Sequence, residues 1–299
     1  MCIKPILLPH SGTTVACGQC YGCRFRKKRD WATRLMHENA THKESCFVTL
    51  TFDDKNLPAN NSVNKKFLTG FIKILREEMR RQKLPKIRYF ACGEYGEKKG
   101  RAHYHIIMFG YDFRNFTKQI QKNLYEATEL LKKKWPYGYV AVGGVSIDSC
   151  KYVASYVVKK LNGDLKDKWK KENPNKEPEF HVGSRNPGIG HKYYEEYIKP
   201  KYQKGYGLLF QTKTTYKGIK VTLPKYYKDK NRVFKNQFKK ELIRQHDQVL
   251  KDKDLLMEPV NKKAKRTKTK PIDILISQNQ QREINGKTKE TLYPQNQTL

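Results

Sequence analysis

Two apolar runs on either side of a short glycine-containing turn constrain the fold of this chain more than any other feature. The runs are KIRYFACGEYG at residues 86–96 and RAHYHIIMFG at residues 101–110, and the turn is GEKKG. Runs of this kind around such a turn predict a β-hairpin. Residues two apart in a strand point to the same face, so His103 and His105 should leave the sheet side by side.

The same hairpin predicts which carboxylate lies beside the two histidines. If Glu94 pairs across from His103, all three side chains share a face, because opposed residues of a hairpin project to one side. Two imidazoles and one carboxylate form a facial set with open positions, which suits a divalent cation such as Mg²⁺ or Mn²⁺ and leaves room for a phosphate oxygen. A register shifted by one residue would substitute Glu97. A pair of hydrogen-bonded histidines with a structural role is the plainer alternative.

The remaining patterns predict an α+β protein. Apolar residues at helical spacing predict a helix over residues 64–82, with a shared apolar face of Phe67, Phe71, Ile74 and Leu75. Further helices are expected at residues 31–42, 117–135 and 148–161, and further strands at 45–54 and 138–147. Helices and strands in this order around a hairpin indicate an antiparallel sheet packed against helices.

Composition along the chain predicts four parts. They are a cysteine-rich basic segment with a helix at 1–44, a core at 45–165, a loop-rich accessory region packed on the core at 166–230, and a basic helix with a largely disordered tail at 231–299. The helix is expected near residues 231–256, and the last forty residues are too basic and polar to build a core.

The charge of the chain indicates a polyanionic partner. Lys and Arg number 62 and Asp and Glu 29, so the net charge is +33. An excess of this size favours nucleic acid, because each contacted phosphate releases counterions. The 19 tyrosines and 13 phenylalanines among the lysines suit stacking on unpaired bases. A generic basic protein with solvated lysines is the alternative.

Neither a membrane span nor a secretory signal is visible in the sequence. No apolar run approaches the ~18 residues that a spanning helix needs. The start, MCIKPILLPHSG, is too short and too broken by prolines for a signal peptide. We therefore expect an intracellular protein without a membrane partner, whose seven cysteines are thiols or metal ligands rather than disulfides.

The helix expected at 148–161 carries a second candidate for chemistry. At ~100° per residue, its apolar residues form one stripe, and a separate face holds Tyr152, Tyr156, Lys159 and Lys160. Asp148 or Ser149 is expected as the N-cap. A tyrosine is a nucleophile only when nearby positive charge activates it, because its free pKa is ~10. Surface aromatics beside lysines are the alternative interpretation.

The N-terminal cysteines have metal-ligand spacing. Cys17, Cys20 and Cys23 follow C-x2-C-x2-C, and Cys2 could supply the fourth donor of a tetrahedral Zn site. An iron–sulfur cluster is disfavoured because the C-x3-C-P that completes the bacterial ferredoxin run does not follow, and free thiols remain an alternative. A basic edge against DNA would come next, formed by Arg24, Arg26, Lys27 and Lys28. The other cysteines are expected in the core: Cys46, Cys92 and Cys150.

At this point the chain resembles a known family. HYH at 103–105 and YVASYVVKK at 152–160 look like the metal motif and the two-tyrosine motif of HUH endonucleases, the rolling-circle replication initiators. The paired tyrosines followed by Lys-Lys resemble the initiators of the Microviridae, which are single-stranded DNA phages. The start MCIKP, the segment CGQCYGCR and the hairpin itself point to the gokushovirus branch. The strand FVTLTF resembles the first motif of the family, and the core resemblance covers residues 45–161.

The resemblance implies a fold and a mechanism. The family has a ferredoxin-like antiparallel sheet, and it uses a divalent cation held by two histidines and a third side chain to polarise the scissile phosphate of single-stranded origin DNA. One tyrosine attacks, the 5′ end stays on the protein, and the second tyrosine cuts the regenerated origin before the ends are rejoined. Arg185, within SRNPGIG, is assigned to DNA binding together with the basic residues after Cys23.

The resemblance also implies partners and a place of action. The substrate would be single-stranded or supercoiled phage DNA in the cytoplasm of the host cell. The sequence has no G-x4-G-K-[ST] motif, so unwinding would require a host helicase and synthesis a host DNA polymerase. A transposase or relaxase with the same chemistry is the nearer rival, although small transposases usually carry one tyrosine and relaxases are usually longer. A non-catalytic single-stranded DNA-binding protein is the more distant rival.

Overall fold

The computed structural model describes residues 2, 5–10, 12–96, 99–158, 164–203, 213–216, 219–231, 257–271 and parts of 273–285. The chain divides into two compact units. One comprises Trp31–Glu195, and the other comprises Met1–Asp30 together with Glu196–Leu299.

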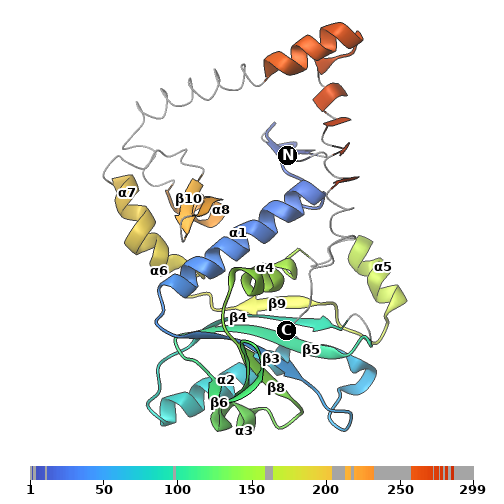
Figure 1. Cartoon of the computed structure of the whole chain (residues 1–299). Helices are drawn as coiled ribbons and strands as arrows, with labels where there is room; N and C mark the ends of the chain where they lie inside the picture. Colours follow the sequence, from blue (N-terminus) through green and yellow to red (C-terminus); the bar gives the residue numbers. More distant parts are fainter. Residues whose placement is uncertain are drawn as a thin grey trace. The chain divides into compact units, whose positions relative to one another are not determined.

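The unit Trp31–Glu195 is built on an antiparallel sheet of seven strands (Figure 1). Their order across the sheet is β6–β7–β8–β3–β5–β4–β9. In chain order the strands are β3 (Ser45–Thr51), β4 (Arg88–Tyr95), β5 (Ala102–Phe109), β6 (Arg114–Gln121), β7 (Leu124–Ala127), β8 (Val140–Gly143) and β9 (Phe180–Gly183). The predicted class, an antiparallel α+β fold, is confirmed.

The centre of the sheet has ferredoxin-like connections. Along the chain, β3, α2 (Lys65–Arg81), β4, β5, α3 (Glu129–Lys134) and β8 form a β-α-β-β-α-β series. In space the four strands are ordered β8–β3–β5–β4, so β5 lies between β3 and β4. The hairpin β6–β7 extends this sheet beyond β8, and β9 extends it beyond β4.

Alternate side chains of the strands face opposite sides of the sheet. One side carries Tyr104 and Ile106 of β5, which pack with Leu75 of α2 and Trp135 after α3 in the main apolar cluster. The other side carries His105, and α4 (Ile147–Ser155) contacts β4 and β5 there. Figure 1 shows α2 and α3 on one side of the sheet and α4 on the other.

Helix α2 follows its predicted limits, with a small change in its buried face. The side chain of Asn64 caps the helix by accepting a hydrogen bond from the backbone N–H of Phe67 at 2.9 Å. Ile74 is 58% exposed, so its predicted place on the apolar face is wrong. The buried stripe instead consists of Leu68, Phe71, Ile72, Leu75 and Met79, spaced by three and four residues.

The helix predicted over residues 117–135 is wrong for most of its length. The chain forms the hairpin β6–β7 there, and α3 is helical only from Glu129 to Lys134. Asn123 turns the hairpin with a φ of 64°, a conformation that asparagine tolerates. Phe116 lies 5.4 Å from Tyr125 across the two strands, measured between ring centroids. A cross-strand aromatic pair of this kind stabilises a hairpin over a helix.

Two further helices have limits that differ from the prediction. Ser146, and not Asp148 or Ser149, is the N-cap of α4, and it forms a reciprocal capping box with Ser149. Helix α4 ends at Ser155 rather than at residue 161. Helix α1 (Tyr21–Ala40) begins well before the expected start at residue 31.

The other described elements are short. They are β1 (Ile6–Leu7), β2 (Thr14–Val15), the 3-10 turn η1 (Ala59–Asn61), α5 (Asp164–Glu172), α6 (His191–Tyr193), the π-helical η2 (Tyr194–Ile198), α7 (Lys199–Gln203), β10 (Lys213–Tyr216), β11 (Ile219–Thr222) and α8 (Lys225–Lys230). Because β9 belongs to the large sheet, the core extends beyond residue 165. Residues 257–267 are helical, which differs from the disorder expected from residue 260 onward. The helix expected at 231–256 lies almost entirely outside the described residues.

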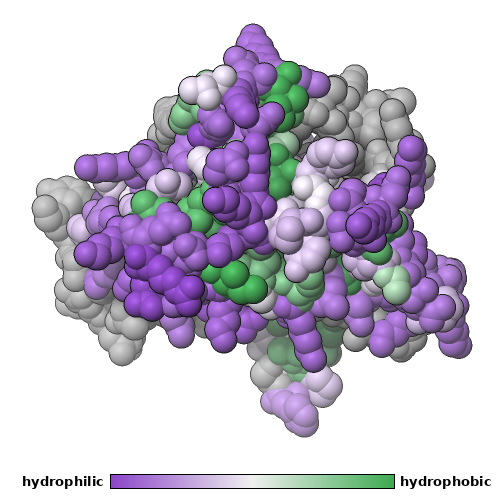
Figure 2. All heavy atoms as spheres, turned by 90° about the horizontal axis from the view of Figure 1, so that it is seen from below, coloured by the Kyte–Doolittle hydropathy of each residue, from purple (hydrophilic) through white to green (hydrophobic). Residues whose placement is uncertain are grey.

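The face of the molecule in Figure 2 is mainly hydrophilic, with hydrophobic areas between the polar ones. None of the helices that the structure describes combines the length and the apolar composition that crossing a bilayer requires.

Candidate active site

Glu94, His103 and His105 meet on the side of the sheet that α4 covers. Glu94 pairs directly with His103 in the β4–β5 ladder, which is the predicted register. Nε2 of His103 lies 2.5 Å from Oε1 of Glu94, and Nε2 of His105 lies 2.9 Å from the same oxygen. One ligand-type atom from each of the three side chains lies within 4.8 Å of the others. The hairpin thus gathers two nitrogens and one oxygen at a single point.

The second ring nitrogen of each histidine is held by a neighbouring group. Nδ1 of His103 lies 2.9 Å from the carbonyl oxygen of Arg101, and Nδ1 of His105 lies 3.0 Å from Oγ1 of Thr49. Because a carbonyl can only accept, Nδ1 of His103 is the donor and Nε2 is directed at Glu94. The ring of Phe47 also stacks on His105 at 5.2 Å. Contacts of this kind fix the orientation of a metal-binding imidazole.

Glu94 is almost completely buried, at 1% exposure, and it is the electrostatic centre of the site. Burial alone would raise the pKa of Glu94, but hydrogen bonds from His103 and His105 outweigh burial and lower the pKa to about 2. Burial lowers the pKa of His105, whereas for His103 the contact with Glu94 outweighs burial and raises the pKa. Oε2 of Glu94 is buried and has no hydrogen-bond partner among the described residues.

Helix α4 brings both predicted tyrosines to this group. The hydroxyl of Tyr152 donates to Oε1 of Glu94 at 2.5 Å and lies 3.4 Å from Nε2 of His105. The hydroxyl of Tyr156 donates to that of Tyr152 at 3.1 Å. Burial and the neighbouring Glu94 carboxylate raise the pKa of Tyr152 above its ordinary range. The two tyrosines share a helix face as predicted, but Tyr156 is 3% exposed, so this face points into the protein.

Three predicted site residues lie outside the described part of the chain. They are the alternative carboxylate Glu97 and the lysines Lys159 and Lys160. The register places Glu94 beside the histidines, as the first of the two predicted registers requires.

Comparison with known proteins identifies the family. Residues 45–161 match the family of the phage replication-associated protein ORF2, over the range where the motifs gave the resemblance. The replication-associated protein ORF2 of Spiroplasma virus 4 is 34% identical over 225 residues, covering 72% of this chain and 66% of that protein. The replication-associated protein VP4 of Bdellovibrio phage phiMH2K is 29% identical, covering 71% of this chain and 66% of the relative.

A third relative is the replication-associated protein ORF4 of Chlamydia phage 1, which is 26% identical over 71% of this chain and 52% of its own length. The chain therefore spans between about half and two thirds of these relatives. It belongs to this family of phage replication-associated proteins. No solved structure matches the chain.

The basic residues assigned to DNA binding in this replication-associated protein are on the surface of the unit to which each belongs. Arg24, Arg26 and Lys27 are exposed on α1, and Lys28 is half-buried. Arg185 is exposed in the loop after β9. Their contact with DNA stays a prediction.

The structure brings the four N-terminal cysteines together. One Sγ atom from each of Cys2, Cys17, Cys20 and Cys23 lies within 4.8 Å of the others, and all four are free thiols. The prediction that the remaining three cysteines belong to the core is confirmed, since Cys46, Cys92 and Cys150 are at most 1% exposed.

Sequence reasoning missed the groups that position the histidines. Thr49 lies two residues after Phe47 in the strand FVTLTF and directly opposite His105, and this alternation was the available signal. It also missed Glu38, a buried carboxylate of α1 that pairs with Arg88 of β4 and accepts a hydrogen bond from the backbone N–H of Gly190 at 2.5 Å. No local pattern signals this contact, because its members are far apart along the chain.

Proposed function

We propose that this protein initiates rolling-circle replication by nicking single-stranded phage origin DNA through a tyrosine that becomes joined to the 5′ end. The observation that supports this most directly is the position of the Tyr152 hydroxyl, which contacts both Glu94 and His105. A nucleophile, two imidazoles and a buried carboxylate at one point are the parts that metal-assisted phosphoryl transfer needs.

The residues fit a divalent cation, Mg²⁺ or Mn²⁺. Both Nε2 atoms and Oε1 of Glu94 converge, and Oε2 of Glu94 is a buried oxygen without a hydrogen-bond partner in the described part of the chain. Glu94, His103 and His105 would hold the ion, and the fixed Nδ1 atoms keep both imidazoles in place. Such an ion would polarise the scissile phosphate and offset the negative charge beside Tyr152.

The protein residues carry out the exchange itself. The Tyr152 oxygen would attack phosphorus, forming a tyrosine–phosphate bond as the bond from phosphorus to the 3′ oxygen breaks. The hydroxyl proton, which Oε1 of Glu94 holds in this structure, is given up, and the departing 3′ oxygen takes up a proton. One ester is exchanged for another, so the reverse reaction can rejoin the ends, and the free 3′-OH can prime synthesis.

The geometry distinguishes the two tyrosines. Tyr152 contacts the carboxylate–histidine group directly, whereas the contact recorded for the Tyr156 hydroxyl is with the Tyr152 hydroxyl. We therefore assign the first cut to Tyr152 and the second cut, made while the first 5′ end is still attached, to Tyr156. Lys159 and Lys160 follow in the sequence and would balance phosphate charge.

The decisive test is formation of a covalent adduct. Full-length protein is incubated with circular single-stranded phage DNA and Mn²⁺ or Mg²⁺, and adducts that resist detergent are separated and mapped. We expect an adduct that needs the divalent ion, a Tyr152→Phe variant that loses most of the first nicking, a Tyr156→Phe variant that retains it, and a double variant with no adduct. Tyr139→Phe, a matched change at a tyrosine that is 76% exposed, should behave as wild type.

The same experiment separates the alternatives. A non-catalytic DNA-binding protein would shift the DNA without any adduct, and this outcome would reject the proposal. A transposase or relaxase would form the adduct but would not depend on two tyrosines to complete a cycle. The family favours the replication role, and a host helicase and polymerase would then act after the first cut.

A further inference from the structure

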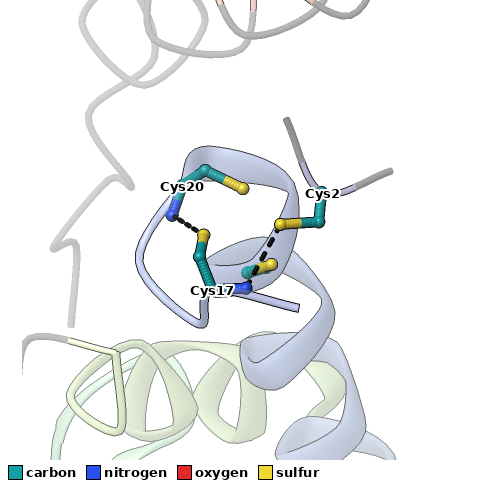
Figure 3. A group of neighbouring side chains, drawn as sticks. Cys2, Cys17 and Cys20 are labelled. Carbon is teal, nitrogen blue, oxygen red and sulfur yellow. Dashed lines mark hydrogen bonds between the residues drawn. The ribbon is translucent and has the colours of Figure 1, made fainter. Parts of the chain in front are cut away.

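The N-terminal segment of the second unit contains a second cluster of metal-ligand side chains. Figure 3 shows Cys2, Cys17 and Cys20 with their side chains turned toward one another where α1 begins. With Cys23, their sulfur atoms all lie within 4.8 Å of one another. The proposed nicking reaction makes no use of this group. We propose that these four cysteines bind one structural Zn²⁺ that fixes the start of α1.

The distances between the sulfurs match the size of a single zinc ion. A tetrahedron with Zn–S bonds of ~2.3 Å has S–S edges of about 3.8 Å. An upper limit of 4.8 Å therefore needs only a small contraction around one ion. A four-iron cluster places several atoms between the sulfurs and requires them to lie farther apart. Four thiolates without an oxygen donor also suit zinc rather than magnesium or manganese.

The backbone is already arranged around the sulfurs. The N–H of Cys17 donates to Sγ of Cys2 at 3.2 Å, and the N–H of Cys20 donates to Sγ of Cys17 at 3.4 Å (Figure 3). Such donors stabilise thiolates more than thiols, because the charged sulfur is the stronger acceptor. Gly18, with a φ of 76°, lets the chain turn between these two cysteines.

The segment has little else to hold it together. Among the described residues from 2 to 30, Cys20 and Cys23 are the two that are buried. Strands β1 and β2 pair over two residues each, and Ile6 and Leu7 of β1 are 51% and 62% exposed. A hairpin this short is not stable by itself in water. Small segments without a core are commonly held by metals or disulfides, and the cysteines here are free.

Zinc would also complete the charge balance of this region. Four thiols bind Zn²⁺ with the release of four protons, leaving a site with a net charge of about −2. Arg24, Arg26 and Lys27 follow at once on α1, and the first turn of that helix has no acidic residue. The helix N-terminus and these cations both stabilise negative charge on the sulfurs.

Metal content of the full-length protein tests the proposal. Protein grown with zinc and iron available and purified without chelators should contain about one zinc per chain. Cys20→Ser should lose it, whereas Cys150→Ala, which removes a buried thiol elsewhere, should retain it. His103→Ala should also retain it, which separates this zinc from a metal at the Glu94 group.

A second measurement does not depend on a variant that folds. Titration of the native protein with a mercurial reagent should release zinc in step with the thiols of this cluster, and protein exchanged with Co²⁺ should show thiolate-to-cobalt charge-transfer absorption. Absence of zinc, iron with acid-labile sulfide, disulfides among these cysteines, or full zinc content in Cys20→Ser would each overturn the proposal. None of these results depends on whether the protein nicks DNA.

Discussion

The two faces of the central sheet use the same strands for different purposes. On β5, Tyr104 and Ile106 are completely buried in the apolar cluster with α2 and α3, whereas His103 and His105 point to the face under α4. The first face is closed by aromatic packing, for example between Trp135 and Phe52 at 5.1 Å. The second face buries polar groups that are paired with one another.

This difference shows how the strand period separates stability from chemistry. Because neighbouring residues of a strand face opposite sides, a single strand can place a packing residue and a metal ligand next to each other in sequence. Changes on the core face should therefore cost stability, and changes on the α4 face should cost activity. The predictions below test that separation.

The largest effect should come from His103→Ala. Loss of this imidazole removes one of three ligands, and a Lewis acid supplies several kcal/mol of transition-state stabilisation, so nicking should fall by about a thousandfold or more. DNA binding should change little, because binding rests mainly on phosphate contacts. The rate of adduct formation measures the effect, and His10→Ala, at an exposed histidine, is the control. Normal nicking by His103→Ala would contradict the site.

Trp135→Ala should show the opposite behaviour. Trp135 is 1% exposed, and its indole N–H donates to the carbonyl oxygen of Thr51 at 3.0 Å. Removing a buried tryptophan costs about 3–5 kcal/mol of unfolding free energy. Urea denaturation should detect this loss, while the protein that remains folded at low temperature should still form adducts. A complete loss of chemistry without loss of stability would break the separation of the faces.

A smaller effect is expected for Thr49→Val, which removes the hydroxyl that holds Nδ1 of His105 and keeps the size of the side chain. Outer partners of this kind are worth about 10–100-fold in metal affinity or activity. The concentration of Mn²⁺ needed for half-maximal nicking should rise. Thr51→Val is a matched control on the same face of β3, because the hydroxyl of Thr51 donates to the carbonyl oxygen of Tyr139 instead. Equal effects of both changes would contradict the role of Thr49.

The parts of the fold and site that the sequence predicted are those set by local spacing. The hairpin register places Glu94 opposite His103 because a short turn leaves few alternatives. The helical spacing of Tyr152 and Tyr156 likewise put both hydroxyls in one group. These contacts could be predicted because each involves residues that are close in sequence.

Tertiary context determined what the sequence could not show. Residues 114–127 have apolar residues that fit a helix as well as a strand, and the edge of β8 decided in favour of strands. Tyr156 was expected on a polar face, but packing against the sheet buries it. The pairing of Glu38 with Arg88 joins a helix to a strand fifty residues away, and residue spacing carries no information on such a contact.

Glu38 gives the last comparison, because it and Glu94 are two buried carboxylates of the same unit with different partners. Glu38 is 1% exposed, and its partners are Arg88, His42 and the backbone N–H of Gly190. Burial alone would raise its pKa, but hydrogen bonds from these groups outweigh burial and lower the pKa below the ordinary 4.5. The ionised carboxylate therefore stabilises the fold above that value, and this contribution is lost as the pH falls through the folded pKa.

Glu38→Gln should accordingly reduce the unfolding free energy by about 1–2 kcal/mol near neutral pH, since it replaces charged hydrogen bonds by neutral ones. The difference from wild type should shrink in acid, because wild-type Glu38 is then protonated as well. Urea denaturation on both sides of the ordinary glutamate pKa measures this. Glu77→Gln, at an exposed carboxylate paired with Arg80, is the control and should show little change. Adduct formation by folded Glu38→Gln should stay near wild type, because Glu38 does not contact the tyrosine–histidine group. A difference in stability that does not vary with pH would show that the charge of Glu38 has no part in holding α1 against β4.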